Sequence, residues 1–240
     1  MKAAVVCLLL LAVVAPSAQA QRSGYDDASP SVRAMQDDDF ANPGMLWARR
    51  GEEIWTSGCA SCHGEAEKSM RGVAARYPAF DPALGRPVTL EQRVSGHQGG
   101  PAFAPESRDL LAITAYVGAQ SKGMPMAVSG EGPAKPFLEA GREFFFLRQG
   151  QLNLSCAQCH DDNKGQKLAG SVIPEGHPNG YPIYRLEWQT MGSLSRRLRN
   201  CLTGVRAELL EYGSPTQVAL ELYLGWRATG LKVETPGVRP

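Results

Sequence analysis

The sequence predicts a mainly α-helical fold made of two similar units in tandem, with long loops and little β structure. Three observations support this prediction. The pattern C-x-x-C-H occurs twice, at residues 59–63 and 156–160. A short helical stretch precedes each copy, and an amphipathic helix follows each copy after a loop-rich stretch. A spacing pattern that recurs in this way indicates a duplicated structural unit.

The chain begins with the pattern of a secretory signal peptide. Lys2 precedes an apolar run from Ala3 to Ala15, and Ala18-Gln19-Ala20 fits a cleavage site. The run is too short to span a bilayer comfortably, and no later stretch is long and apolar enough to do so. We therefore expect an exported, periplasmic protein without a membrane span, cleaved after Ala20 and starting with a polar extension over residues 21–46.

Charge and cysteine content narrow the class further. The 240 residues carry 25 Lys and Arg against 24 Asp and Glu, so the chain lacks the basic surface typical of nucleic-acid binding, and we expect no nucleic-acid partner. Of the six cysteines, Cys7 would leave with the signal peptide and four lie in the two motifs. An odd number then remains in an oxidising compartment, so we expect no disulfide and a separate role for Cys201.

The two motifs predict two covalently bound c-type haems. Two thiols three positions apart lie on one side of a helical turn, where they can bond one haem, and the adjacent histidine ligates the iron. A thioredoxin-like pair would not need this histidine, and a shared zinc site would not be expected between motifs so far apart. The predicted attachment residues and proximal ligands are Cys59, Cys62, Cys156, Cys159, His63 and His160.

The helices around the motifs have matching features. The stretches at 50–55 and 140–146, before the motifs, each contain a glycine and an aromatic residue about one turn later, and such a glycine allows another helix to approach closely. The final helices are expected over 108–117 and 216–224, where apolar residues recur at helical spacing. Pro215 suits the start of the second of these helices.

This order of helix, C-x-x-C-H, loops and final helix resembles class I cytochrome c. The resemblance implies two such domains, at residues 47–126 and 137–232. The Gly- and Pro-rich stretch around residues 127–136 is interpreted as the linker. Residues 233–240 would form a C-terminal tail.

In a class I cytochrome the distal haem ligand comes from the loop between the motif and the final helix. In the first unit, Met70 lies only seven residues after His63, and Met124 and Met126 come after the final helix. His97 lies just before that helix and is therefore the preferred distal ligand. A surface histidine in a Gly-rich loop is the alternative.

In the second unit the candidates are His177, Met191 and Cys201. Three arginines lie in the five residues before Cys201. Nearby cations favour the thiolate, which is the form that binds metal and attacks electrophiles. Arginine also binds oxyanions through paired donors, so an anionic sulfur substrate would suit this cluster. A buried inert cysteine beside a solvated helix face is the alternative.

The second half also resembles one particular family. The stretches that carry this resemblance lie at 122–126, 141–145, 150–156, 179–186, 213–215 and, most specifically, in the Arg-x-Arg-x-Cys pattern at 197–201. They are similar to SoxA, the cytochrome c subunit of the thiosulfate-oxidising SoxAX complex, also called L-cysteine S-thiosulfotransferase. The matching stretches cover most of residues 88–240.

The resemblance implies a role for each central residue. Cys201 would be both the distal ligand of the second haem and the reactive sulfur, often found as a persulfide, and Arg197 would lie beside the substrate. The implied reaction joins thiosulfate to a cysteine of the carrier protein SoxYZ and passes two electrons to haem. Implied partners are SoxX, a monohaem cytochrome c, and a downstream cytochrome c.

One departure from the family and three rival functions accompany this interpretation. Dihaem members usually carry a cysteine ligand for the first haem where this chain has His97. The rivals are a thiosulfate dehydrogenase that forms tetrathionate, a plain dihaem electron carrier and a gas-sensing haem protein. A plain carrier needs no arginine cluster, and a gas sensor would need an open iron site.

Overall fold

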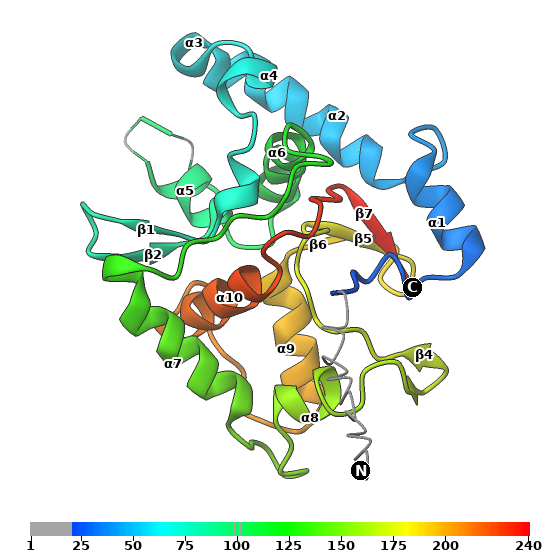
Figure 1. Ribbon diagram of the computed structural model, residues 1–240. Coiled ribbons are helices and arrows are strands. Elements are labelled where there is room, and N and C mark those ends of the chain that lie inside the picture. The colour runs from blue at the N-terminus through cyan, green and yellow to red at the C-terminus, as the bar shows by residue number, and fades with distance from the viewer. Residues whose placement is uncertain (1–20, 98, 101) are drawn as a thin grey trace, which may run out of the picture.

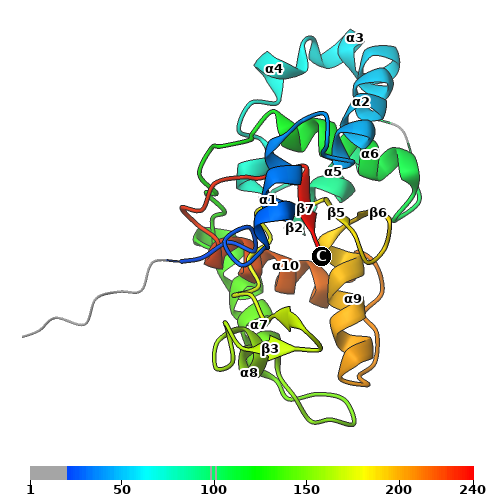
Figure 2. The ribbon, with the colours of Figure 1, turned by 90° about the vertical axis from the view of Figure 1, so that its right-hand side faces the viewer.

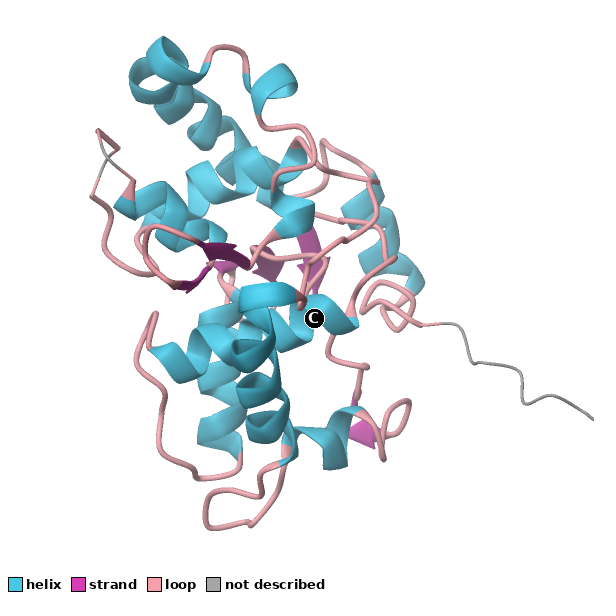
Figure 3. Cartoon of the chain, turned by 60° about the vertical axis from the view of Figure 1, so that its left-hand side comes forward, coloured by secondary structure: helices cyan, strands magenta, loops and turns pink. Residues whose placement is uncertain are grey.

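The computed structural model describes residues 21–240 except 98 and 101. The predicted signal peptide therefore lies outside the described residues. Helices dominate the described chain, and the strands are short (Figure 3). The prediction of a mainly α-helical fold with little β structure is confirmed.

The first repeat lies at the top of Figure 1. Its elements are α2 (Gly44–Ile54), the π-helical turn η1 (Trp55–Cys59), α3 (Ala60–His63), α4 (Ala66–Ser69), the 3-10 turn η2 (Ala74–Arg76), β1 (Ala79–Asp81), β2 (Arg86–Val88), α5 (Leu90–Gly96) and α6 (Arg108–Ala119).

The second repeat lies below the first in the same view. Its elements are the 3-10 turn η3 (Gly132–Ala134), α7 (Lys135–Phe146), α8 (Cys156–His160), β3 (Lys167–Leu168), β4 (Ser171–Val172), β5 (Ile183–Arg185), β6 (Thr190–Gly192), α9 (Leu194–Gly204) and α10 (Pro215–Arg227).

Each repeat is built on one close helix crossing. Helix α2 packs on α6, and α7 packs on α10. A Cβ atom at Gly51 would lie 2.1 Å from the carbonyl oxygen of Ala112, and a Cβ atom at Gly141 would lie 2.0 Å from that of Ala219. Only glycine allows such close contact of the two backbones. The same crossing therefore places a C-x-x-C-H motif just beyond the first helix of each pair.

A strand hairpin and a capped helix precede the final helix in both repeats. Strands β1 and β2 pair antiparallel, as do β5 and β6. Helix α5 begins at Thr89, whose hydroxyl accepts a hydrogen bond from the backbone N–H of Gln92, and α9 begins at Ser193, whose hydroxyl accepts one from that of Arg196. These caps satisfy backbone donors that the first helical turn leaves free. The hairpins thus fix where α5 and α9 start.

The N-terminal extension and the C-terminal tail pack against each other. Helix α1 (Pro30–Asp37) contacts β7 (Gly237–Arg239), which adds to β5 as a parallel strand (Figure 1). The Gln36 side chain accepts a 2.8 Å hydrogen bond from the backbone N–H of Val238. The side-chain amide of Asn42 donates to the carbonyl of Pro236 at 3.0 Å. Residues that follow the second repeat are therefore ordered as a strand.

A small apolar core joins the two repeats. Leu111 and Ala115 of α6 pack against Met191 of β6, which is completely buried. In the side view the first repeat and α9 lie on either side of this strand region (Figure 2). Over residues 21–240, apart from 98 and 101, no helix has the length and apolarity needed to cross a membrane.

Candidate active site

Helix α8 carries the second motif and is held by its own caps. The Ser155 hydroxyl accepts from the backbone N–H of Gln158 at 3.3 Å, and the Gln158 side chain accepts from the Ser155 N–H at 2.9 Å. This reciprocal pair stabilises a helix of only one turn. Cys156 and Cys159 are free, partly buried thiols on that turn, which is the arrangement that bonding to one haem requires.

His160 is oriented by the loop that follows it. Its Nδ1 lies 2.7 Å from the carbonyl oxygen of Pro174, so Nδ1–H donates and Nε2 is left free for a metal. Gly176 has φ +79°, and a Cβ atom there would lie 3.1 Å from the His160 ring. The loop therefore supports the ring both by a hydrogen bond and by close packing.

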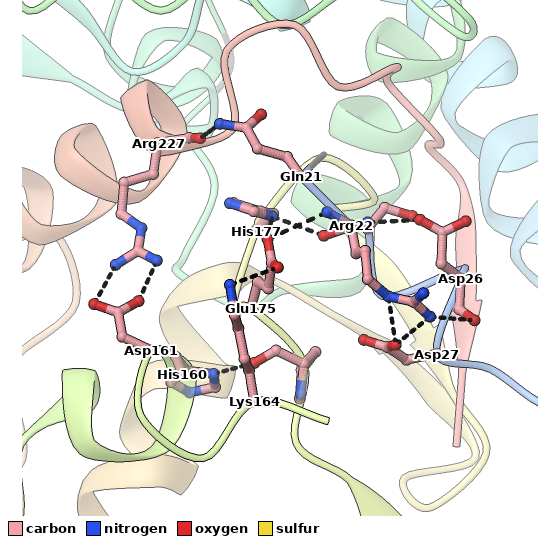
Figure 4. Close-up of polar contacts among 12 residues, drawn as sticks. Gln21, Arg22, Asp26, Asp27, His160, Asp161, Lys164, Glu175, His177 and Arg227 are labelled. Atoms are coloured by element: carbon pink, nitrogen blue, oxygen red, sulfur yellow. Dashed lines mark hydrogen bonds and ion pairs between the residues drawn. The ribbon is translucent and has the colours of Figure 1, made fainter. Parts of the chain in front are cut away.

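A network of ion pairs fixes this loop (Figure 4). Glu175 is buried; its carboxylate accepts from the backbone N–H of Arg22 at 3.2 Å and from Lys164 Nζ at 3.1 Å. The Nδ1 atom of His177 lies 2.8 Å from the carbonyl oxygen of Arg22. The start of the described chain is thereby tied to the loop that positions His160.

The end of α10 is tied to the end of α8 by a separate ion pair. Arg227 contacts Asp161 through both guanidinium nitrogens, at 2.5 and 3.3 Å. The same guanidinium lies 4.4 Å from the centre of the Phe145 ring on α7. Because Asp161 directly follows His160, these contacts fix the end of the motif against α7 and α10.

Cys201 meets the second motif from α9. Burial opposes ionisation of its thiol, but hydrogen bonding to His160 and the charges of Arg197 and Arg185 outweigh burial, so the pKa of Cys201 is lowered. Burial, and then the charge of Cys201, raise the pKa of Cys156 to about 11. The structure therefore brings Cys201 together with His160 and the attachment thiols.

The surroundings of Cys201 are cationic. Arg197 lies one helical turn before Cys201, so the two residues share one face of α9. Tyr181 is enclosed beside them, and burial raises the pKa of its hydroxyl to about 12. A thiolate next to guanidinium groups is suited to react with an anionic sulfur compound, because the cations offset the repulsion between two negative charges.

The first motif forms a second centre with His97. The rings of His63 and His97 have centres 5.8 Å apart and an interplanar angle of 68°. A metal bound by two facing imidazoles at about 2 Å from each nitrogen would separate the ring centres by about 6 Å. His97 Nδ1 lies 2.9 Å from the Arg93 carbonyl, which leaves Nε2 free. Unlike the second centre, this one is open, since Cys62 and His63 are exposed.

Comparison with known proteins identifies the family. The family model described as "SoxA/TsdA, cytochrome c domain" matches residues 45–126 and 140–233. The chain belongs to the SoxA/TsdA cytochrome c family. Among curated SoxA relatives, each named L-cysteine S-thiosulfotransferase subunit SoxA, that of Pseudaminobacter salicylatoxidans is 37% identical over 90% of this chain and 80% of its own. That of Rhodovulum sulfidophilum is 36% identical over 91% of this chain and 80% of its own.

A solved structure gives the same result in three dimensions. The chain is similar to one in the crystal structure of SoxXA from P. pantotrophus, with a TM-score of 0.86 and 35% sequence identity. The match covers 92% of this chain and 87% of that chain. The resemblance inferred from the sequence is thereby confirmed for both the family and the fold.

Membership of this SoxA/TsdA family indicates covalently bound c-type haem, and the residues present fit that group. Every cysteine among the described residues is a free thiol. His160 and His97 each direct Nδ1 to a backbone carbonyl, as histidine ligands commonly do. Each motif therefore offers two thiols and a histidine that could hold a haem. A further side chain that could bind iron lies close to each motif histidine, namely His97 at the first and Cys201 at the second.

The other candidate ligands lie elsewhere. Met191 is fully buried in the core between the repeats. His177 is engaged with Arg22 and Glu175. Met70 packs in the apolar core of the first repeat, and the Met124 side chain lies beside Gly72.

Two features of the site were missed from the sequence. Pro174, whose carbonyl orients His160, lies in an irregular loop and has no distinctive pattern. Arg185 lies in one of the family-like stretches, but no role was assigned to it. The signal that could have singled it out is the internal repeat, because Arg185 stands where the first repeat has Asp81.

Proposed function

We propose that this chain is the catalytic A subunit of an L-cysteine S-thiosulfotransferase, which oxidises thiosulfate by joining it to a cysteine of a SoxYZ-type carrier protein. The observation that carries the proposal is the position of Cys201. Its thiol lies against His160 and the attachment thiols, with guanidinium groups close by. A plain electron carrier does not need a reactive thiol in that place.

We further propose two haems with distinct ligand pairs. Cys59 and Cys62 would hold the first haem, with His63 and His97 as its iron ligands. The second haem would be held by Cys156 and Cys159 and ligated by His160 and Cys201. Support comes from the facing rings of the first pair and from the contact between the second pair.

The chemistry of Cys201 follows from thiol–disulfide exchange. The Cys201 thiolate bonds to the outer sulfur of thiosulfate, which gives a Cys201–S–S–SO₃⁻ adduct and releases two electrons. The carrier thiolate then attacks the outer thiosulfate sulfur of this adduct, takes the S–SO₃⁻ group and regenerates the Cys201 thiolate. A haem held by Cys156, Cys159 and His160 would supply the electron acceptor for the first step.

The protein's own groups assist both steps. Arg197 would bind the sulfonate oxygens and offset their charge while two anions approach each other. The lowered pKa of Cys201 favours the thiolate form of its sulfur, which acts as the nucleophile in the first step and is the leaving group in the second. A persulfide on Cys201 could react in the same manner.

We propose that this chain pairs with a SoxX-type monohaem cytochrome c, which passes electrons to a downstream cytochrome c. The similarity to a chain of the SoxXA complex supports this pairing. We also propose export to the periplasm with cleavage after Ala20, in agreement with the site of haem c attachment in bacteria. Mass spectrometry of the purified subunit would test the cleavage site, and a chain that still begins at Met1 would refute it.

Thiosulfate-dependent cytochrome reduction tests the function. The complex of this chain with its monohaem partner should reduce cytochrome c only when a SoxYZ-type carrier is present, and the carrier should gain the mass of one thiosulfate. Cys201→Ala should abolish both signals, whereas Asn200→Ala, an exposed position on the same helix, should retain them. Activity of Cys201→Ala would refute the mechanism. Tetrathionate formation without a carrier would instead support a thiosulfate dehydrogenase.

A further inference from the structure

The two repeats share one register through the segment that faces the haem motif. The hairpin from Ala79 to Val88 corresponds, 104 residues later, to the hairpin from Ile183 to Gly192, and the end residues pair in the same way. The helix caps Thr89 and Ser193 keep this offset. His97 and Cys201 each lie eight residues after their cap, so they occupy equivalent positions.

The same register matches the charged residues around these positions. Arg93 and Arg197 correspond, each four residues before the proposed ligand. In the first repeat the Arg93 guanidinium is neutralised by Asp81, at 2.5 Å, and the Asp81 side chain is only 7% exposed. In the second repeat the position of Asp81 is occupied by Arg185. An ion pair in one repeat is thus replaced by two cations in the other.

Arg185 is an enclosed cation whose hydrogen-bonding capacity is not filled. Its side chain is 13% exposed, and within the described chain its buried Nε has no hydrogen-bond partner. Burial, and then the neighbouring charge of Arg197, lower its pKa. The carboxylate of Glu187 accepts a hydrogen bond from Nη2 at 2.8 Å, but Glu187 is 58% exposed. Two partly buried guanidinium groups close together are unfavourable unless anions accompany them.

Trp188 holds the Arg185 guanidinium in place. The Arg185 guanidinium carbon lies 5.2 Å from the centre of the Trp188 ring, and that of Arg196 lies 4.3 Å from it. Trp188 in turn packs on Gly192, where a Cβ atom would lie 2.4 Å from the ring. Arg185 is therefore positioned in advance, and little side-chain entropy is lost when it binds a ligand.

We propose that Arg185 is a second oxyanion-binding residue of the Cys201 centre, which acts with Arg197 to hold the sulfonate group of thiosulfate. Two guanidinium groups provide paired N–H donors that suit a trigonal set of oxygens. The first repeat cannot bind an oxyanion in this way, because Arg93 already forms an ion pair with Asp81. The proposal rests on the function proposed above and adds a residue that the sequence pattern did not single out.

Arg185→Gln tests this role in the haem-loaded complex with its monohaem partner. Two quantities are measured: thiosulfate affinity by calorimetry on the oxidised complex, and KM and kcat in the carrier-dependent assay. Loss of hydrogen bonds to a charged ligand should raise Kd and KM about ten-fold or more. Arg49→Gln is the control, since it removes the same charge from an exposed position on α2 in the first repeat, and it should change neither value more than about two-fold.

The outcomes separate this inference from the proposed function. If Arg185→Gln and the control Arg49→Gln bind thiosulfate equally, the inference is wrong, even when the wild-type complex is active. Unchanged thiosulfate affinity with a shifted potential of the second haem would also overturn it and would indicate a haem propionate as the partner of Arg185. If Arg185→Gln weakens thiosulfate binding but the wild-type complex has no carrier-dependent activity, the anion site is supported and the proposed reaction is rejected.

A more conservative variant keeps the test valid if Arg185→Gln lowers haem content. Arg185→Lys retains the charge but removes the fork of two donors. It should still raise Kd several-fold, because lysine does not replace arginine where an oxyanion is held by paired donors. Wild-type affinity in a folded Arg185→Lys complex would contradict paired recognition by Arg185.

Discussion

Glu221 provides a quantitative prediction, because it is a carboxyl group enclosed where the two repeats meet. It lies on α10 and is 4% exposed. Its Oε1 accepts hydrogen bonds from Ser195 Oγ at 2.7 Å and from Gln217 Nε2 at 3.1 Å. Burial, and then the nearby carboxyl group of Glu91, raise its pKa from 4.5 to about 8.

The sign of the pH effect follows from this raised pKa. Between pH 4.5 and 8 the folded protein keeps a proton on Glu221 that the unfolded chain has released, so stability falls as pH rises. The destabilisation is absent below about pH 4.5, grows as the pH rises and is complete above about pH 8. One pKa unit corresponds to about 1.4 kcal/mol, so the whole change is about 5 kcal/mol, of which about 3–4 kcal/mol falls between pH 5 and 8.

Glu221→Gln should remove this dependence, since glutamine keeps the acceptor oxygen and carries no charge. As the pH rises from 5 to 8, the free energy of unfolding of the variant should increase by about 3–4 kcal/mol relative to that of the wild type. The Tm of the variant should then rise relative to that of the wild type by about 10 °C. Thermal unfolding of the haem-loaded protein, followed by circular dichroism at pH 5, 6, 7 and 8, measures this difference.

Glu208→Gln is the control, because Glu208 is exposed in the loop after α9. It should leave the pH dependence of Tm unchanged. A Glu221→Gln protein that is less stable than the wild type at pH 8, or whose Tm difference does not change with pH, would refute the reasoning.

Three further predictions concern the packing and the two proposed haem centres. Gly141→Ala should destabilise the fold by about 1–3 kcal/mol, because its Cβ would lie 2.0 Å from the backbone of Ala219, whereas Gly204→Ala, with no atom within 4 Å, should be nearly neutral in a thermal melt. His97→Ala should change the low-spin spectrum and the potential of the first haem, and an unchanged spectrum would exclude His97 as a ligand. Glu175→Gln should loosen the loop that holds the Pro174 carbonyl against His160 and shift the potential of the second haem alone. Equal shifts in both haems would contradict that local effect.

The parts of the structure that the sequence predicts are those with a local signal. Each C-x-x-C-H motif is contiguous, and the helices over 108–117 and 216–224 follow from apolar spacing; the structure has α6 and α10 there. The close crossings at Gly51 and Gly141 also follow from a local glycine. These features need no knowledge of distant contacts.

The parts that could not be predicted depend on contacts between distant segments. The pairing of β7 with β5 joins the end of the chain to the second repeat, and Gln36 then bonds to Val238. Neither segment has enough strand or helix pattern to indicate its partner. In the same way, the bond between Arg22 and Glu175 depends on two loops meeting, although it supports the loop that orients His160.

The two repeats show how one framework can serve two different centres. Both place a residue eight positions after a helix cap, against a motif histidine, and in one repeat that residue is histidine while in the other it is cysteine. An imidazole can bind iron but has no exchangeable sulfur, so only the second centre can form a sulfur–sulfur bond. The residue at the end of the first hairpin strand differs in the same sense. Asp81 neutralises Arg93 and suits a centre that binds no anion, whereas Arg185 adds to the charge of Arg197 beside Cys201. The residue that faces the motif histidine and the charge beside it thus differ together, which agrees with the proposed division between an electron-transfer centre and a thiosulfate-binding centre.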